Sequence, residues 1–312
     1  MIVDAHCHLV DRDWLPQRWW DGVVKVAIHV LEKMGMPNVT ADMVLNELLP
    51  GMMFDPSGEK QLAAMEDAGI DMVVLFPVDY GLPLGEPPVS IEDINKAFAD
   101  LAKKYPKKFV ALATVDPRRP QARDLVKQAV EEWGMKGLKF HCGSGFYPNS
   151  KESYALLECI AKYNLPVISH TGHILAPLYS KFCDPMWLDD VCVDFPDTVF
   201  VAAHFGHGFH RQVAHFGACK TNLWTDFSDW QRRAAHEYKL FCESLRSALD
   251  NFTPERVMFG TDGPYLRQVL TDKDYVQIFK DLPEKAAGGI GFTKEEIDAV
   301  LGGNAARLFN LT

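Results

Sequence analysis

The sequence contains no CxxC pair, and its seven cysteines are scattered, which argues against a disulfide framework and against a zinc ribbon. It lacks any apolar run that approaches the roughly 18 residues needed to span a membrane. It also lacks a basic stripe, and its formal charge of −10 at pH 7 is unsuited to a polyanionic partner. These absences exclude nucleic acid and membrane as partners and leave a small molecule as the expected one.

We expect no signal peptide, because the first apolar segment begins at Ile2. An odd number of scattered cysteines is typical of reduced thiols, so we expect a cytoplasmic protein. We also expect the chain to form a homo-oligomer, specifically a dimer.

What the sequence has in quantity is apolar residues, at 47% of the chain, in a regular alternation of two kinds of segment. Short β-rich runs recur whose apolar residues are mostly continuous, as in parallel strands that are covered on both faces. These runs are 2–6, 71–76, 109–115, 137–141, 166–170, 199–204, 221–227 and 257–262. Helical patterns separate most of them, at 58–69, 90–105, 120–133, 150–164 and 231–252.

Eight β-rich runs that alternate with helices predict an α/β fold, a (β/α)8 TIM barrel, as a single domain over residues 1–312. Ser90 and Ser150 suit helix N-caps, and Pro120 suits a first helical position. An open doubly wound sheet is the alternative, but no Gly-rich nucleotide turn follows the first run.

Residues 9–57 separate the first strand from its helix, which is far more than the usual loop between such elements. The segment is rich in large apolar side chains: Trp14, Trp19, Trp20, Met34, Met36, Met52, Met53 and Phe54. It follows the carboxyl end of a strand, where barrels build their active sites. We therefore expect a barrel distorted by a helical insert that serves as a lid or pocket wall, with packing away from the substrate as the alternative. The Pro/Gly segment 81–88 predicts an ordinary connection.

The segment IVDAHCH (2–8) ends in two histidines one residue apart. Because side chains alternate along a strand, both should point the same way, where two neutral imidazoles can share a metal ion; two hydrogen-bonded histidines at a strand end are the alternative. Three later runs also end in a candidate polar residue, and the carboxyl ends of barrel strands converge on one face. Three imidazoles and a carboxylate, with a position left for water, predict a catalytic metal site. The expected ligands are His6, His8, His170 and Asp262, with His204 beside them.

The motifs DAHCH, ISHTG, AAHFGH and FGTDGPY, in this order, resemble the amidohydrolase superfamily. They are most similar to the amidohydrolase 2 branch, which contains aminocarboxymuconate-semialdehyde decarboxylase and related metal-dependent TIM-barrel hydrolases. The closing GGNAARLFNL (302–311) is also similar to that branch. The resemblance implies one divalent ion, zinc with manganese as the alternative, since both suit such ligands. It implies the same four ligands, His6, His8, His170 and Asp262, and a role for His204 in the chemistry.

These observations predict a metal-dependent hydrolase that cleaves an amide, ester or lactone bond of a small, carboxylated molecule. A bound divalent ion acidifies water and polarises carbonyls, Asp262 can accept a proton, and His204 is expected to titrate near neutral pH. The alternative is non-oxidative decarboxylation of a small unsaturated or aromatic acid. Several aromatic-acid decarboxylases of the branch have Glu in place of the first His, and His6 departs from that pattern. A barrel that binds metal without catalysis is a further alternative, which the complete ligand set disfavours.

Lys139, in the run 137–141, has two interpretations. A lysine on the corresponding strand of binuclear amidohydrolases is carbamylated and bridges two metals; we favour instead an ammonium that orients an anionic substrate. His207, His210 and His215 predict an ordinary loop and helix surface, with a contribution to a second metal as the alternative. Further substrate contacts are predicted at His141, His173, Arg12, Arg18 and Arg267.

Overall fold

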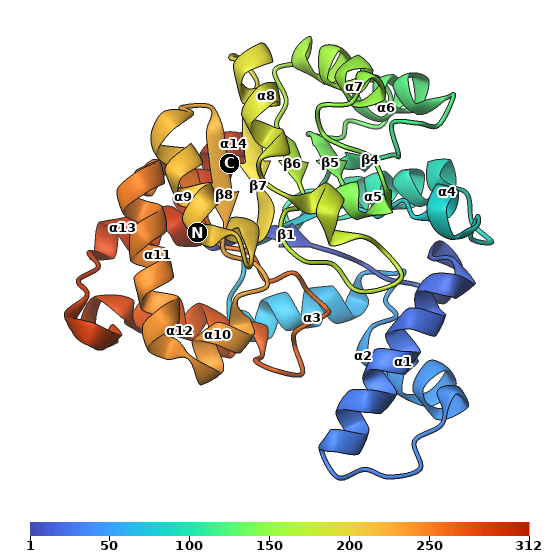
Figure 1. The fold of residues 1–312 in the computed structure, drawn as a ribbon, viewed down its shortest axis with the longest axis horizontal. Helices are drawn as coiled ribbons and strands as arrows, with labels where there is room; N and C mark the ends of the chain where they lie inside the picture. The colour runs from blue at the N-terminus through green and yellow to red at the C-terminus, as the bar shows by residue number, and fades with distance from the viewer. Residues whose placement is uncertain (312) are drawn as a thin grey trace.

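The computed structural model, which describes residues 1–311, alternates parallel strands with helices along the chain (Figure 1). The strands are β1 (Val3–Cys7), β2 (Met72–Leu75), β3 (Phe109–Ala111), β4 (Ala113–Thr114), β5 (Leu138–Phe140), β6 (Val167–Ser169), β7 (Phe200–Ala202), β8 (Leu223–Asp226) and β9 (Val257–Met258). The α-helices are α1 (Gln17–Lys33), α2 (Leu49–Met52), α3 (Glu59–Ala68), α4 (Gly81–Leu84), α5 (Ile91–Lys104), α6 (Ala122–Glu131), α7 (Lys151–Ala161), α8 (Trp187–Asp194), α9 (His210–Cys219), α10 (Gln231–His236), α11 (Tyr238–Phe252), α12 (Asp272–Lys285), α13 (Lys294–Asp298) and α14 (Asn304–Phe309). Within residues 1–311, no helix combines the length and the apolar character needed to cross a membrane.

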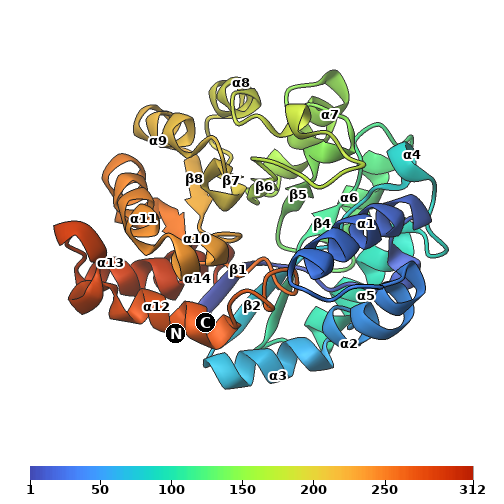
Figure 2. The ribbon, with the colours of Figure 1, turned by 60° about the horizontal axis from the view of Figure 1, so that its bottom comes forward.

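The strands pair in parallel in the order β1-β2-β3 and β4-β5-β6-β7-β8-β9. β3 and β4 are two halves of one strand, interrupted at Leu112, whose backbone N–H still donates to the carbonyl of Leu75 in β2 (2.9 Å). Past β9 the chain returns to β1, where the N–H of Ala5 donates to the carbonyl of Phe259 (2.9 Å). The strands therefore form the predicted (β/α)8 TIM barrel, with helices outside them (Figure 2).

Every residue of the nine strands is buried, which explains why the strands appear in the sequence as continuous apolar runs. Side chains that alternate along the strands form two apolar layers. The inner layer fills the barrel with Val3, Ala5, Val74, Phe76, Leu112, Ile168, Val201 and Met258, and Ala305 and Phe309 of α14 join it. The outer layer packs between strands and helices. The first strand, β1, and the last helix, α14, contact each other (Figure 2).

Two predicted helix starts are confirmed and one is wrong. The hydroxyl of Ser90 accepts a hydrogen bond from the N–H of Asp93 (3.1 Å), and that of Ser150 accepts one from Ser153 (3.2 Å), so both serine residues are N-caps. Pro120 lies in a turn before α6 and not in its first turn. Proline fixes φ in a range that turns share with helices, so it does not by itself locate a helix start.

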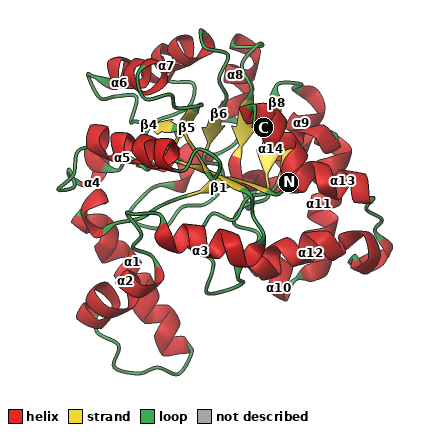
Figure 3. Cartoon of the chain, turned by 180° about the vertical axis from the view of Figure 1, so that it is seen from behind, coloured by secondary structure: helices red, strands yellow, loops and turns green. Residues whose placement is uncertain are grey.

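Two segments differ from the simple pattern. The helical pattern 231–252 forms two helices, α10 and α11, because Glu237 between them adopts φ −135° and ψ 49°. The connection 81–88 contains the short helix α4. Outside the strands, α3 packs beside α12 (Figure 3). None of these features changes the order of the barrel.

The predicted insert, residues 9–57, forms a helical lobe that extends away from the barrel (Figure 1). It contains α1, a π-helical turn (Met43–Leu48) and α2. The lobe has its own apolar cluster, which includes Val10, Leu15, Trp19, Trp20, Val24, Val44 and Leu49. The same cluster contains Val78 and Tyr80, which follow β2, so the lobe is anchored on the face where strands end.

Candidate metal centre

The polar residues predicted at the strand ends do gather at one end of the barrel. His6 lies in β1, Lys139 in β5 and Asp226 at the end of β8. Four others follow the strands β1, β6, β7 and β9 directly or within four residues, namely His8, His170, His204 and Asp262. The parallel strands place all of these side chains on the carboxyl-terminal face.

Three of the predicted ligands lie close enough to share one ion. Oδ1 of Asp262 is 3.5 Å from Nε2 of His6 and 3.5 Å from Nε2 of His8. One ligand atom from each residue lies within 4.8 Å of the other two. The Asp262 side chain is 16% exposed whereas that of His6 is fully buried, so the cluster opens to solvent on the side of Asp262.

Hydrogen bonds fix the orientation of both imidazoles of the HxH pair. Nδ1 of His6 donates to Oδ2 of Asp226 (2.9 Å), and Nδ1 of His8 donates to the carbonyl oxygen of Phe76 (3.0 Å). Each ring therefore carries its proton on Nδ1 and presents the lone pair of Nε2 to Asp262. A carboxylate or carbonyl behind a histidine is the usual support of a metal ligand. The donor set thus fits a divalent ion.

His170, the fourth predicted ligand, is bound to its neighbours in a different way. Its Nε2 lies 3.2 Å from the carbonyl oxygen of His173, and its Nδ1 lies 3.0 Å from Nε2 of His204. The three groups of possible metal ligands found among residues 1–311 do not include His170. The ring of His204 lies 4.5 Å from that of His6, so His204 joins His170 to the cluster. Ligation by His170 stays a prediction and requires its contact with His204 to open.

Asp226 is the functional candidate that the sequence analysis missed. Besides its contact with His6, its Oδ1 accepts the backbone N–H of His204 (3.0 Å) and contacts the hydroxyl of Ser228. That hydroxyl lies 2.8 Å from Nδ1 of His204. The buried carboxylate therefore positions both histidines. A signal was present, because Asp226 lies one residue before the end of the seventh β-rich run, close to where the other candidates lie in theirs.

The backbone is strained at two of the site residues. His204 and Asp262 adopt positive φ angles of 61° and 52°. Such conformations are costly for side chains other than glycine, and they persist where the surrounding structure holds them. The indole N–H of Trp230 donates to the carbonyl of His204 (2.7 Å), and the N–H of Asp262 donates to the carbonyl of His6 (2.8 Å). These bonds hold both turns in place.

Burial keeps His6, His170 and His204 uncharged. Loss of hydration, followed by the charge of Lys139, lowers the pKa of His6 well below its usual 6.5 and lowers that of His170 to about 3. Burial and the neighbouring His6 lower the pKa of His204 well below 6.5. Neutral imidazole is the form that binds metal. The expectation that His204 titrates near neutral pH is wrong, because the buried cation has no water around it.

Lys139 is fully buried at the centre of this group. Its Nζ lies 3.0 Å from Nε2 of His6 and 4.4 Å from the centre of the Phe76 ring. Burial lowers the pKa of Lys139 to about 8, although the carboxylates of Asp226 and Asp262 oppose this. The amine therefore stands close to its own titration at neutral pH.

His141 has an unsatisfied polar atom. Its ring stacks on that of His170 at 4.6 Å, and its Nε2 lies 3.0 Å from the hydroxyl of Tyr80. Its buried Nδ1 has no hydrogen-bond partner among residues 1–311. Buried polar atoms are nearly always paired in folded proteins, so an orphan beside the cluster indicates a place for a ligand atom.

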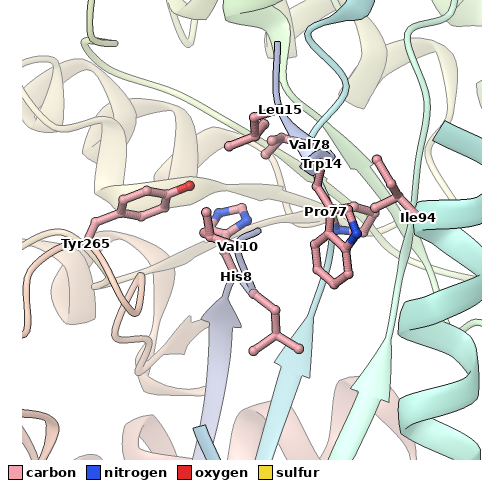
Figure 4. A pocket seen from close by; sticks show the side chains of 9 residues that line it. His8, Val10, Trp14, Leu15, Pro77, Val78, Ile94 and Tyr265 are labelled. Atoms are coloured by element: carbon pink, nitrogen blue, oxygen red, sulfur yellow. The ribbon is translucent and has the colours of Figure 1, made fainter. Parts of the chain in front are cut away.

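A narrow pocket adjoins His8 (Figure 4). Tyr265 lies on one side of His8, and Trp14, Pro77 and Ile94 lie on the other. Leu9, Val10, Leu15 and Val78 complete the lining. The walls are apolar apart from His8 and the Tyr265 hydroxyl, and the insert contributes Leu9, Val10, Trp14 and Leu15 to them. Whether the insert also contacts substrate stays a prediction.

The predicted arginines lie away from this pocket. Arg12 and Arg18 are exposed on the insert, where they bond to Asn46 (2.7 Å) and to the carbonyl of Pro83 (3.4 Å). Arg267 is paired with Asp272 (2.8 Å). None of the three lines the pocket beside His8. His173 is exposed and does not line this pocket; its ring lies 4.5 Å from that of His207.

Known structures resemble this chain over nearly its whole length, whereas no curated protein matches it. A 2,6-dihydroxybenzoate decarboxylase complexed with 2,6-dihydroxybenzoate is 15% identical, with a TM-score of 0.67 and 99% of each chain covered. A 5-carboxyvanillate decarboxylase from Novosphingobium aromaticivorans, complexed with manganese and 4-hydroxy-3-methoxy-5-nitrobenzoic acid, is 15% identical (TM-score 0.65; 100% of this chain and 96% of the other). A probable 2-pyrone-4,6-dicarboxylic acid hydrolase from Acinetobacter baumannii, with citric acid bound, is 14% identical (TM-score 0.64; 99% of each chain). These similarities show a common fold.

The sequence itself also matches a family description. The match to the amidohydrolase family covers residues 3–311. It begins in β1 and ends after α14, so it includes every strand that contributes to the cluster. The chain therefore belongs to the amidohydrolase family.

Proposed function

We propose that this protein is a metal-dependent hydrolase that cleaves an amide, ester or lactone bond of a small, carboxylated molecule. The observation that carries the proposal is the meeting of His6, His8 and Asp262, which bring their ligand atoms within 4.8 Å of one another on the open side of the cluster. His6 lies in the first strand, His8 follows it directly and Asp262 follows the last strand, so this meeting exists only in the closed barrel.

We propose one divalent ion, zinc or alternatively manganese, held by His6, His8 and Asp262, with His170 as the fourth ligand. Such an ion supplies a Lewis acid that favours the deprotonated form of water and polarises a carbonyl. Three features of the chain suit it: lone pairs of two oriented imidazoles, a carboxylate, and the pKa of His6, which burial keeps low. The related 5-carboxyvanillate decarboxylase was solved with manganese.

The residues around the cluster suit a substrate carboxylate. The ammonium of Lys139 is a buried cation without a carboxylate partner within ion-pair distance among residues 1–311, and a substrate anion can fill that place. The unpaired Nδ1 of His141 offers a further hydrogen bond. The ligands of the related structures, including 2,6-dihydroxybenzoate and citric acid, also carry carboxyl groups.

Proton transfer falls to Asp262 and His204. Asp262 is the acid of the cluster that reaches solvent, so its carboxylate can accept the proton of an attacking water. His204 is neutral and buried, so it acts through a ring N–H that stabilises negative charge on the carbonyl oxygen or the leaving group. Asp226 and Ser228 hold its ring and backbone in position.

Decarboxylation is the second candidate, and the apolar pocket favours it. A substrate carboxylate placed against the apolar side chains of Trp14, Leu15 and Val78 loses part of its hydration. Hydration stabilises the charged carboxylate more than neutral carbon dioxide, so its loss favours decarboxylation. Two of the related structures described above are decarboxylases of aromatic acids. The departure at His6, where several aromatic-acid decarboxylases have Glu, keeps hydrolysis first.

A substrate screen with two products separates these reactions. Metal-free protein, reloaded with zinc or manganese, is incubated with carboxylated amides, esters and lactones and with unsaturated and aromatic acids. Hydrolysis yields a new carboxylate, and decarboxylation releases carbon dioxide. Asp262→Asn should abolish turnover, whereas Asp298→Asn, an exposed change in α13, should not. Turnover that survives Asp262→Asn, or a fully metal-loaded protein that converts none of these compounds, would contradict the proposal.

A further inference from the structure

A second group of possible metal ligands lies outside the first one. His173, His207 and Asp229 each offer one ligand atom within 4.8 Å of the other two. Nδ1 of His207 lies 2.9 Å from Oδ2 of Asp229, and the rings of His173 and His207 are 4.5 Å apart. The side chains of His207 and Asp229 are 16% and 25% exposed, and His173 is exposed. We name these three residues the outer triad.

Each residue of the outer triad lies three positions after a buried residue of the same type, on three neighbouring strands. His173, His207 and Asp229 follow His170, His204 and Asp226 by three residues each. The parent strands β6, β7 and β8 are consecutive in the sheet. Each strand therefore supplies one polar residue to the buried cluster and a second one of the same type to the rim above it.

Near the outer triad, the backbone at Gly172 lies against the backbone of His207. Gly172 has φ +105°, and a Cβ at this position would lie 2.7 Å from the carbonyl oxygen of His207. Asp229 also has a positive φ, of 62°. Backbone in this region is costly, and it persists where the surrounding structure fixes it. Trp230, next to Asp229, is held by its bond to the carbonyl of His204, and its ring lies 5.6 Å from that of His207.

From this geometry we infer that the outer triad is a second binding site for a divalent transition-metal ion, separate from the inner centre. Two imidazoles and a carboxylate with an open side are a ligand set that zinc and related ions accept. Zinc bonds of about 2.0–2.1 Å place tetrahedral ligands about 3.3 Å apart, so rotation of these partly exposed side chains closes the group around an ion. The ring of His173 is exposed beside that of His207, and a neutral imidazole has one lone pair that an ion can bind.

This site differs from a carbamate-bridged pair, because it does not use Lys139 and its ligands lie on the rim. It also does not depend on the proposed reaction. An isolated, partly exposed pair of His207 and Asp229 contributes little stability by itself, so a contribution to stability alone gives no reason for the third residue. The open side of the site leaves room for water or for an oxygen ligand from outside.

Zinc stoichiometry tests the site directly. Full-length protein is stripped of metal, dialysed against zinc and analysed for zinc per chain. The wild-type chain should hold two ions. The variant His173→Ala/His207→Ala should hold one, and Asp229→Asn should weaken the second ion at least tenfold while its side chain still tolerates a positive φ. The matched control His215→Ala/His236→Ala changes two exposed histidines outside the triad and should hold two.

The inner centre provides the distinguishing comparison. His6→Ala/His8→Ala should also lose one ion, but the ion that remains should then be sensitive to Asp229→Asn. Cobalt, which reports its ligands through its absorption spectrum, should give two separable spectra in the wild-type chain. One ion per chain that is lost only in the His6/His8 variant, or two ions that persist in His173→Ala/His207→Ala, would overturn the inference. Thermal unfolding of each variant shows whether a loss of zinc reflects loss of the fold.

Discussion

Lys139 occupies an environment that opposes its charge. It is fully buried, its amine faces the ring of Phe76, and burial lowers its pKa to about 8 from 10.5. Lys139 contributes no stability to the fold in this position, since a buried cation without a carboxylate partner destabilises it. The residue is therefore best explained by what it binds, and its cost to stability can be measured.

Replacing Lys139 should stabilise the metal-free protein. Between pH 8 and 10.5 the folded chain releases this proton while the unfolded chain keeps it, so the free energy of unfolding rises with pH in that window. Below pH 8 the folded state carries the full cost, about 3 kcal/mol. Lys139→Met should thus raise Tm by several degrees at pH 7, and this advantage should vanish by pH 10.5. Exposed Lys136→Met is the control, and a lower Tm for Lys139→Met at pH 7 would contradict the argument.

The activity of a Lys139 variant distinguishes its two interpretations. If the ammonium orients the substrate, Lys139→Ala should leave the number of bound ions unchanged and raise KM for an anionic substrate. The resulting loss in kcat/KM should correspond to about 1–3 kcal/mol. If the lysine is a carbamate bridge, the variant should lose one ion, and short carboxylates should restore it. We expect the first outcome. A crystal structure with two ions about 3.5–4 Å apart beside a modified Lys139 would overturn it.

The HxH pair should control both inner metal and turnover. His6→Ala/His8→Ala removes two of the three nitrogen ligands proposed for the inner ion, so we expect one ion fewer per chain and no measurable activity. Circular dichroism should show an unchanged barrel, because these rings lie at the strand ends and not in the apolar layers. The exposed pair His215→Ala/His236→Ala serves as the control. Unchanged metal content in the His6/His8 variant would refute the assignment.

The insert is the element that most distinguishes this barrel from a plain one. Trp14 both packs on Phe98 of α5, at a ring distance of 5.5 Å, and lines the pocket beside His8. If the insert forms the pocket wall, Trp14→Ala or deletion of part of 14–54 should raise KM well above the wild-type value and leave the metal content unchanged. Met34→Ala, at the exposed position that directly follows α1, should have no effect on kinetics. Normal kinetics in a folded Trp14→Ala protein would show that the insert only packs.

The strands could be predicted from the sequence and the details of several connections could not. Strands such as β2 and β6 are buried on both faces, so their apolar runs are continuous and short. The break at Glu237 between α10 and α11 has no such signal, because it depends on how both helices pack. The expected position of Pro120 was wrong for a similar reason, since turns and helices accept the same φ.

The site was predictable in its composition and less so in its contacts. The convergence of His6, His8, His170, His204 and Asp262 follows from the barrel alone. The link between His170 and His204, and the low pKa of His204, depend on burial and ring orientation that only coordinates supply. The sequence position of Arg267 predicts a contact with substrate, yet Asp272, five residues later, pairs with it.

At the scale of the whole molecule, the inner centre joins the two ends of the fold. His6 lies in the first strand, His8 follows it directly, and Asp262 follows the last one. The same two strands close the barrel through the backbone bond from Ala5 to Phe259. An ion bound between them therefore needs the closed barrel, and the unfolded chain does not present this site. Binding to the folded state alone stabilises that state by mass action.

Removal of the metal should consequently lower Tm. With free ion at about 1,000 times Kd the stabilisation is about 4 kcal/mol, which is several degrees for a chain of this size. Addition of a chelator to the wild-type protein should remove this stabilisation, and thermal unfolding at constant pH measures the loss. His173→Ala/His207→Ala should keep most of this shift, because the outer triad does not join the first and last strands. His6→Ala/His8→Ala should lose most of it. An equal shift in the His6/His8 variant and the wild-type protein would mean that the stabilising ion sits elsewhere.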